Sequence, residues 1–326
     1  MDNFVKLALE NGGSIHPLII PAEYTNGTGI MNPSILVDGD KIRVIIRHVN
    51  YTFYHSEKKL FQHQWGPLTY VHPENDMHLR TTNYYCELDD NYSISRFDKI
   101  DTSKFPDQEL WEFVGLEDAR IFRWNEKLYI SGVRRDLDTI GTGRMELCEI
   151  EVREDSVVEV ERFRIPPPND PNSYCEKNWM PILDKPYHYV KWSNPTEVVK
   201  VDPETQTSKT VHMGNVISLP RDLRGGTQVL TIGDYYVTCT HEVDLFNSEV
   251  GRKDARYYHR FMIWDKNWNP VLYTKEFNFM GGDVEFCIGM AKHNGNFLMT
   301  FGFQDNAAYL LRVTEDYLEK FINENS

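Results

Sequence analysis

The strongest candidate for chemistry is a run of charged residues in the segment 115–120 (GLEDAR), directly before the apolar segment 121–124. Alternate side chains of a strand share one face, so Asp118 and Arg120 are expected to point one way. Glu117 should then point into the interior and serve structure. A neighbouring guanidinium sets the charge state of an acid, and a general acid needs such tuning. Asp118 is therefore the candidate catalytic acid, although a structural Asp–Arg pair explains the same spacing.

Cationic residues stand near the ends of several other β-rich segments: Arg47, Arg134, Arg135, Lys177 and His241. Arg and His offer several fixed donors, which suit planar or tetrahedral oxyanions. Each cation taken alone is explained as a solvated surface residue. Because cations recur at equivalent positions, we expect one phosphate-binding site formed by these side chains: Arg47, Arg120, Arg135, Lys177 and His241.

The segment 176–179 (EKNW) combines an acid, a base, an amide and an indole. Sugar sites commonly join an apolar ring face to a few polar groups, although Trp179 fits an ordinary core residue equally well. The candidate substrate contacts are Asn32, Glu117, Asn178, Trp179, Glu285 and Asp305. Asp136 and Asp138 match a DxD metal motif that arises too often by chance to count, and the chain has no glycine-rich phosphate loop, GxSxG or HExxH. No metal site is expected.

These residues lie in five segments that repeat one pattern of a polar start, a short apolar strand, a turn and a second β-rich strand. The segments are 32–49, 115–135, 176–192, 224–243 and 284–305. Repeated hairpins of this kind predict an all-β, five-bladed β-propeller, because one blade alone cannot bury its faces. The innermost strands should start within two residues of Asn32, Glu117, Asn178, Thr227 and Glu285. The alternative is a pair of β-sandwiches.

The rest of the chain fits outer strands and short terminal helices. Alternating segments at 145–152, 156–165, 197–202, 260–265 and 308–313 predict half-exposed strands. Helices are expected near 3–10 and in 314–325. The stretch 51–112 should supply outer strands of the first blade and a long loop. No Pro/Ser-rich hinge divides the chain, so we expect a single domain, 1–326.

Composition narrows the classes of partner. The chain has 326 residues, a formal net charge of -14, 40% hydrophobic residues and 13% aromatic residues. Such a charge should repel nucleic acid and anionic lipid, and no apolar run is long enough for membrane insertion. Five scattered cysteines without a CxxC, and an acidic N-terminus, favour a reduced cytoplasmic protein. Self-association into a homo-oligomer stays open.

These motifs resemble glycoside hydrolase family 130, which comprises β-mannoside phosphorylases and related enzymes built on a five-bladed propeller. The resemblance covers roughly 32–313. The family's glycine–acid–aspartate–proline–arginine signature resembles 115–120, its early asparagine–proline resembles Asn32 and Pro33, and its hairpin arginine and fourth-repeat histidine resemble Arg47 and His241. Its last-blade motifs resemble 286–289 and 302–305. Other motifs in 176–179, 224–227 and 258–261 resemble a branch found beside bacterial glycosyltransferases.

The chain departs from the family at three places: Ala119 replaces a proline, 177–179 reads KNW rather than lysine–aspartate–alanine, and 225–226 reads GG rather than glycine–proline. The resemblance implies single-step inversion, in which phosphate attacks the anomeric carbon while Asp118 protonates the leaving oxygen through a sugar hydroxyl. It implies an oligosaccharide or sugar-phosphate substrate, with phosphate or sugar phosphate as co-substrate and no other cofactor.

Three functions stay open at this point. Phosphorolysis of β-mannosides, or the equivalent transfer from a phosphorylated sugar donor, comes first. Hydrolysis of β-mannosides needs a second carboxylate across the sugar, for which the candidates are Glu176, Glu242, Glu285 and Asp305. The third is a non-catalytic glycan-binding propeller that partners a glycosyltransferase.

Overall fold

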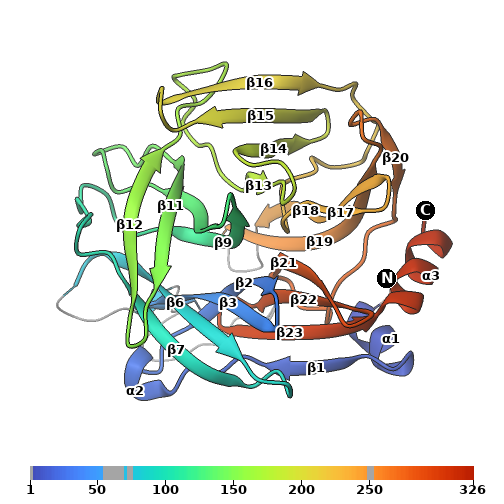
Figure 1. Ribbon diagram of the computed structural model, residues 1–326, viewed down its shortest axis with the longest axis horizontal. Helices are drawn as coiled ribbons and strands as arrows, with labels where there is room; N and C mark the ends of the chain where they lie inside the picture. The colour runs from blue at the N-terminus through green and yellow to red at the C-terminus, as the bar shows by residue number, and fades with distance from the viewer. Residues whose placement is uncertain (1–2, 54–69, 72–75, 248–252) are drawn as a thin grey trace.

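The computed structural model describes residues 3–53, 70–71, 76–247 and 253–326. Their strands assemble into antiparallel units around a central axis (Figure 1). The five-bladed β-propeller predicted from the repeats is confirmed, and the sandwich alternative is wrong.

Each blade has four strands, and its innermost strand faces the axis (Figure 1). Blade 1 contains β2 (Ile30–Asp38), β3 (Lys41–Val49), β6 (Leu79–Leu88) and β7 (Ile94–Asp101). Blade 2 contains β9 (Glu117–Trp124), β10 (Lys127–Arg134), β11 (Arg144–Val152) and β12 (Val157–Arg164). Blade 3 contains β13 (Met180–Pro181), β14 (His188–Ser193), β15 (Thr196–Asp202) and β16 (Thr207–Met213).

Blade 4 contains β17 (Leu230–Ile232), β18 (Tyr235–Asn247), β19 (Lys253–Trp264) and β20 (Pro270–Tyr273). Blade 5 contains β21 (Glu285–His293), β22 (Asn296–Phe303), β23 (Ala307–Thr314) and β1 (Ser14–Pro17). Two short pairings lie outside the blades: β4 (Thr52–Phe53) with β5 (Tyr70–Val71), and β8 (Phe113–Val114) with β6. The outer strands β7 and β12 pair in parallel and join blades 1 and 2.

The burial pattern along each strand depends on the position of that strand in its blade. β10 and β22 are buried along most of their length because neighbouring blades cover both of their faces, whereas the outermost β16 alternates exposed and half-buried residues. The hairpin turn between β9 and β10 places Asn125 and Glu126 at positive φ, which suits the twist of the two strands.

Four of the five innermost strands begin within two residues of the predicted position. The fourth begins at Leu230, three residues late, because the chain before it approaches β18 irregularly: Thr227 N–H donates to the carbonyl of Cys239 at 2.9 Å. The expected outer strands and terminal helices are also present, the helices as α1 (Phe4–Glu10) and α3 (Glu315–Glu324). Helix α2 (Ala22–Thr25) was not expected. Outer strands β6 and β7 occupy part of the stretch 51–112, whose expected loop lies largely outside the described residues.

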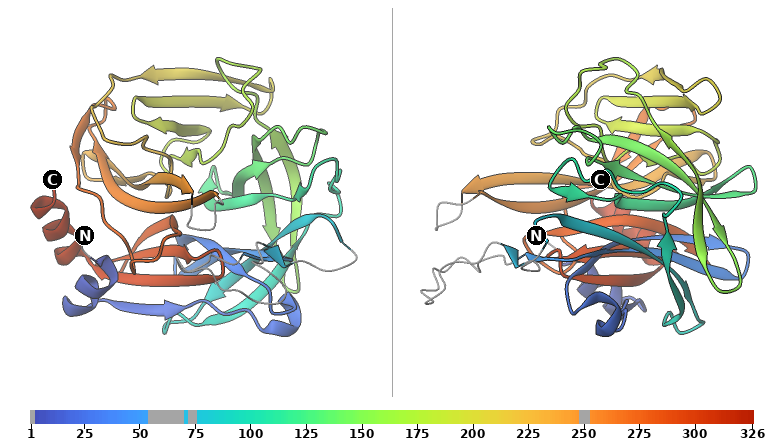
Figure 2. Two further views of the ribbon diagram at one scale, coloured as in Figure 1. Left: turned by 180° about the vertical axis from the view of Figure 1, so that it is seen from behind. Right: turned by 90° about the vertical axis from the view of Figure 1, so that its left-hand side faces the viewer.

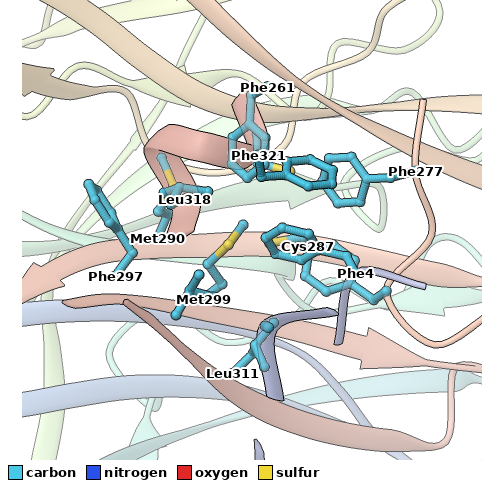
Figure 3. Close-up of a cluster of buried hydrophobic side chains, with 14 of the residues drawn as sticks. Phe4, Phe261, Phe277, Cys287, Met290, Phe297, Met299, Leu311, Leu318 and Phe321 are labelled. Atoms are coloured by element: carbon cyan, nitrogen blue, oxygen red, sulfur yellow. The ribbon is translucent and has the colours of Figure 1, made fainter. Parts of the chain in front are cut away.

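The two ends of the chain close the ring together. β1 pairs antiparallel with β23, from Ser14 opposite Arg312 to Pro17 opposite Tyr309, so the N-terminal strand completes the last blade. Helices α1 and α3 lie side by side at the edge of blade 5 (Figure 1). The Phe4 ring packs against that of Phe321 at 4.7 Å between centroids, inside a cluster with Phe261, Phe277 and Phe279 (Figure 3).

Phe4→Ala is expected to lower the free energy of unfolding by about 3–5 kcal/mol, because it removes a fully buried ring and leaves a cavity at the ring closure. Urea unfolding followed by tryptophan fluorescence measures the change. Leu9→Ala, on the same helix but 44% exposed, is the matched control and should change it little. Equal effects of the two substitutions would contradict the role assigned to Phe4.

Candidate active site

Some of the residues predicted to do chemistry meet at one end of the innermost hairpins. Arg47, near the end of β3, donates from one terminal nitrogen to Asp118 Oδ1 at 3.0 Å and from the other to Glu117 Oε2 at 3.1 Å. Its Nε donates to Thr81 Oγ1 at 3.1 Å. Arg47 is only 6% exposed, and its guanidinium is occupied by two carboxylates. It positions the acids and is not a free phosphate ligand.

A bulge at the start of β9 brings both acids to Arg47. Asp118 has φ 51°, and the pairing of β9 with β10 shifts register between Ser131 and Val133. The bulge needs glycine at 132, because a Cβ there would lie 2.3 Å from the Glu117 carbonyl oxygen. The expectation that Glu117 points into the blade was therefore wrong, since regular strand alternation fails at this point.

Asn32 is a second donor to the Asp118 oxygen that Arg47 contacts. Its Nδ2 donates to Asp118 Oδ1 at 2.8 Å, and its backbone has φ 45°. Burial alone would raise the pKa of Asp118, but Arg47 and the Asn32 hydrogen bond, with the charges of Arg120 and Lys177, bring it below its ordinary value. Asp118 is therefore a carboxylate in the substrate-free protein.

Arg120 links the innermost strands of different blades. Its guanidinium donates to the carbonyls of Asp118 at 2.8 Å and Gly226 at 3.0 Å, and approaches Asn178 Oδ1 at 3.5 Å. Burial lowers the pKa of Arg120 to about 10, with Asp118 acting in the opposite direction. Because Arg120 contacts the carbonyl of Asp118 rather than its carboxylate, the expected Asp–Arg side-chain pair is not formed.

His241, part-way along β18, is neutral rather than the expected cation. The Gly225 carbonyl lies 2.7 Å from Nδ1, so Nδ1–H must donate and Nε2 is left as an acceptor. The pKa of His241 is held well below its usual range, mainly by burial and next by the nearby His259. The Tyr257 ring stacks on the imidazole at 5.4 Å, and Phe286 packs against it at 4.5 Å.

Two cations stay available for an anion. Lys177 is exposed and Arg224 is half-buried, and both act electrostatically on His241, while Lys177 also acts on Asp118. Within the part of the chain that the structure describes, neither side chain makes a hydrogen bond or ion pair. The backbone of Arg224 pairs with that of His241 in both directions, at 2.8 and 3.1 Å. Lys177 was predicted, whereas Arg224 was missed, although it heads the fourth repeat directly before two glycines.

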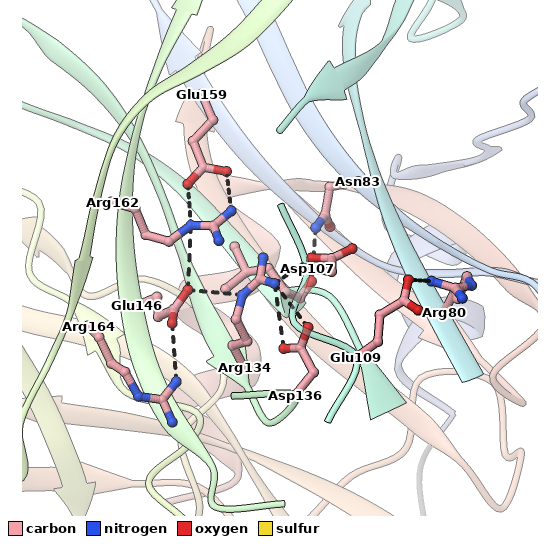
Figure 4. Close-up of polar contacts among 11 residues, drawn as sticks. Arg80, Asn83, Asp107, Glu109, Arg134, Asp136, Glu146, Glu159, Arg162 and Arg164 are labelled. Carbon is pink, nitrogen blue, oxygen red and sulfur yellow. Dashed lines mark hydrogen bonds and ion pairs between the residues drawn. The ribbon is translucent and has the colours of Figure 1, made fainter. Parts of the chain in front are cut away.

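The other two predicted cations, Arg134 and Arg135, contact protein groups rather than a possible anion site. Arg134 is 2% exposed and lies in a buried ion network with Asp107, Asp136 and Glu146 (Figure 4). Arg135 donates to Cys175 Sγ at 3.0 Å and lies over the Tyr174 ring, which gives it a partner other than an anion. The five-cation phosphate site predicted from the sequence therefore does not form as expected.

Two predicted substrate contacts are structural. Trp179 is 1% exposed in the core, where Nε1 donates to Glu176 Oε2 at 3.1 Å, so its ring cannot form a sugar platform. Glu285 accepts backbone N–H bonds from Phe279, Met280 and Gly282 at 2.7–2.9 Å and so fixes the preceding loop. Burial of both side chains could not be read from residue type alone.

Asp305 and Tyr257 complete the site. Asp305 follows β22 at φ 49°, and burial raises its pKa to about 6, while Arg47 opposes and Asp118 and Glu117 reinforce this shift. Burial also raises the pKa of Tyr257, and the negative charges of Asp305 and Asp118 raise it further. Tyr257 was missed because it lies in β19, outside the repeated segment 224–243. β18 and β19 project beyond one face of the propeller (Figure 2), and Tyr257 lies on that long hairpin opposite Val243.

Comparison with known proteins places this geometry in a known fold. No family model and no curated protein matches the sequence. A β-1,2-mannobiose phosphorylase from Listeria innocua, solved with β-1,2-mannobiose, superimposes at 12% identity over 95% of this chain and 97% of that one, with a TM-score of 0.59. The chain has the propeller fold of the family 130 enzymes.

Two further structures agree with this fold. A mannose phosphorylase from Leishmania mexicana, in complex with phosphate, matches at 11% identity over 97% of this chain and 93% of that one, with a TM-score of 0.55. A third structure comes from the GH130 family of mannoside phosphorylases, and its description says that this family contains glycoside hydrolases that target β-1,2 mannosidic linkages. It matches at 12% identity over 89% of this chain and 85% of that one, with a TM-score of 0.56. No helix among the described residues has the length and apolar character needed to span a membrane.

Proposed function

We propose that this protein is a carbohydrate-active enzyme that makes or breaks glycosidic bonds by single-step inversion. The reaction is β-mannoside phosphorolysis or the equivalent glycosyl transfer from a phosphorylated sugar. The observation that carries the proposal is the Asp118 carboxylate, fixed by Asn32 and Arg47, within electrostatic range of the uncommitted cation Lys177. The fold shared with phosphorylases that bind mannobiose and phosphate supports the same reaction.

The proposed anion site consists of Lys177 and Arg224, which flank His241. Phosphate held there needs no protein nucleophile, because its own oxygen attacks the anomeric carbon. Nε2 of neutral His241 can accept a hydrogen bond from a protonated phosphate oxygen or a sugar hydroxyl. The charge of the bound anion also raises the pKa of Asp118, because it offsets the cations that now keep the carboxyl ionised. Anion binding thereby prepares Asp118 to protonate the leaving oxygen.

Hydrolysis is the second candidate, and one observation favours it. Of the four predicted bases, Glu176 bonds to Trp179 and Lys191, Glu242 pairs with Arg221 and Arg260, and Glu285 accepts three backbone N–H bonds. Asp305 is the one that acts electrostatically on Arg47 beside the acid. A hydrolase would use the Asp305 carboxylate to activate water.

The test is a panel of β-mannosides, including β-1,2-mannobiose, incubated with and without phosphate while free sugar and sugar 1-phosphate are measured separately. Phosphorolysis predicts sugar 1-phosphate only when phosphate is present, whereas hydrolysis predicts free sugar in both conditions. Lys177→Met and Arg224→Met should each raise the KM for phosphate at least ~10-fold, because each removes a charge-assisted contact to the anion. Binding of a mannoside without any turnover would instead support the glycan-binding alternative.

A further inference from the structure

The innermost strands β2, β9 and β21 each lie at the edge of their sheet. The N–H and C=O groups on the open side of an edge strand need other partners when they are buried, and Gln228 supplies some of them. Its Nε2 donates to the carbonyl oxygens of Ile35 on β2 at 2.7 Å and Ile121 on β9 at 2.8 Å, and its Oε1 accepts from the N–H of Met290 on β21 at 3.3 Å. One side chain at the start of blade 4 therefore joins the innermost strands of blades 1, 2 and 5, which gather near the centre of the propeller (Figure 1).

The amide of Gln228 is completely buried and bonded at both ends. A carbonyl oxygen can only accept and a backbone N–H can only donate, so the amide nitrogen must face Ile35 and Ile121 and the amide oxygen must face Met290. Both N–H groups of the side chain are used. Asn carries the same planar amide but is one methylene shorter, so this set of contacts requires the length of Gln as well as its chemistry.

The two carbonyls that Gln228 holds lie close in sequence to the site. Ile35 follows Asn32 by three residues on β2, and Ile121 follows Asp118 by three residues on β9. The hydrogen bond from Asn32 Nδ2 to Asp118 Oδ1, at 2.8 Å, joins the same two strands. Gln228 therefore ties β2 to β9 one short step below the contact that holds the proposed acid.

Ser34 is a second buried link between these strands. Its Oγ donates to the Ala119 carbonyl at 2.7 Å and accepts from the Ile121 N–H at 3.0 Å. The backbone of Ile121 is thus held at its N–H by Ser34 and at its carbonyl by Gln228. The spacing between β2 and β9 is set by side chains that are fully buried, away from any substrate.

The segment that carries Gln228 also holds two other site residues. The Gly225 carbonyl accepts from Nδ1–H of His241 at 2.7 Å, and the Gly226 carbonyl accepts from Nε of Arg120 at 3.0 Å. These glycines precede Gln228 by three and two residues. A displacement of Gln228 is therefore expected to reach His241 and Arg120 through the same short segment.

We propose that Gln228 is a positioning residue whose amide sets the spacing between β2 and β9 and thereby lets Asn32 hold the Asp118 carboxylate in place. The clamp is a property of the free protein, and its effect on catalysis rests on the proposed function. Without the amide, two buried carbonyls and one buried N–H lose their partner, which is costly enough for the strands to shift. Asp118 then moves relative to the leaving oxygen, and a displacement of about 1 Å can lower a rate ~100-fold.

The first test uses the substrate-free protein and ¹H–¹⁵N NMR. Gln228→Met keeps the length and the packing of the side chain but removes the amide. The side-chain amide signal of Asn32, assigned by its absence in Asn32→Ala, should shift in Gln228→Met, because its contact with Asp118 changes. An Asn32 signal at the wild-type position would overturn the proposal. If Gln228→Met does not fold, Gln228→Asn, which keeps the amide but not the reach, is expected to shift the signal and is judged in the same way.

The matched control is Thr196→Val. Thr196 is 1% exposed on β15, and its Oγ1 accepts from Nε1 of Trp264 on β19 at 2.8 Å, so this substitution removes another buried hydrogen bond between blades. Thr196 makes no hydrogen bond to a residue of the proposed site. Thr196→Val should therefore leave the Asn32 signal unchanged, and an equal shift in the control would overturn the specific role of Gln228.

The second test compares rates on two substrates. A positioning role predicts that Gln228→Met lowers kcat for a β-mannoside disaccharide ~10- to 100-fold with little change in KM, but lowers kcat for an activated aryl mannoside much less, since that leaving group needs little protonation. The same loss on both substrates, as partial unfolding would produce, would overturn the catalytic part of the proposal. If the wild-type protein turns over no mannoside, the proposed function fails, whereas the NMR test still decides whether Gln228 positions Asn32.

Discussion

Asp118→Asn is expected to lower turnover of a natural disaccharide by ~100- to 10,000-fold, the usual contribution of a general acid. The amide keeps the shape of the side chain and the contact with Arg47 or Asn32, but it cannot donate the proton that the leaving oxygen needs. The loss should be much smaller for an activated aryl mannoside, whose leaving group needs little protonation. Steady-state rates with both substrates measure the difference.

The matched control for this substitution is Glu117→Gln. It removes the neighbouring acid on the same arginine, at 3.1 Å from Arg47, without touching the proposed proton donor. We expect a loss of stability and a smaller loss of activity, similar for the two substrates. Full turnover of a disaccharide by Asp118→Asn would remove Asp118 from the mechanism, and with it the main reason to prefer an enzyme over a glycan-binding propeller.

Arg47→Met should lower the free energy of unfolding by about 3–5 kcal/mol at pH 7, because it leaves Glu117, Asp118 and Asp305 partly buried without their shared cation. The loss should depend on pH. Without Arg47 the main attraction that lowers the pKa of Asp118 is gone, so the folded variant binds protons more readily than the wild type as the pH falls. The destabilisation is therefore largest at neutral and alkaline pH and shrinks toward pH 4.

Chemical denaturation at several pH values tests this expectation. Arg153→Met is the control, since its ion pair with Glu151 is exposed and should contribute no more than about 1 kcal/mol. A pH-independent effect of Arg47→Met would mean that packing of the side chain, rather than charge balance among the acids, is what the substitution removes.

The arrangement of the blades could be predicted because the same hairpin pattern occurs five times in the sequence. Each repeat shows which two strands pair, and the number of repeats gives the number of blades. The meeting of Arg47, Asn32 and Asp118 followed from the same alignment, since equivalent strand ends gather around one axis. The orientation of Glu117 could not be predicted, because it depends on a bulge and a positive φ at Asp118 that strand alternation does not reveal. A glycine in the partner strand at 132 is the one local hint of that bulge.

The charge and the burial of individual site residues were harder to predict than the arrangement of the blades. His241 has the residue type of an anion ligand, but the Gly225 carbonyl and burial make it neutral. Trp179 and Glu285 stand at the expected strand ends, yet their side chains are directed into the protein. Arg224 and Tyr257 reach the site because of the irregular start of blade 4 and the length of its central hairpin, which no spacing in the sequence encodes.

The most direct test of the central claim is to identify the first product formed from a β-mannoside in phosphate buffer by ¹H and ³¹P NMR, since a sugar 1-phosphate keeps the anomeric configuration in which it is formed. Single-step inversion predicts α-configured sugar 1-phosphate as the first product from wild-type protein, and its near-complete absence with Asp118→Asn. Formation of the β-anomer, or equal product from both proteins, would contradict an inverting mechanism in which Asp118 is the acid.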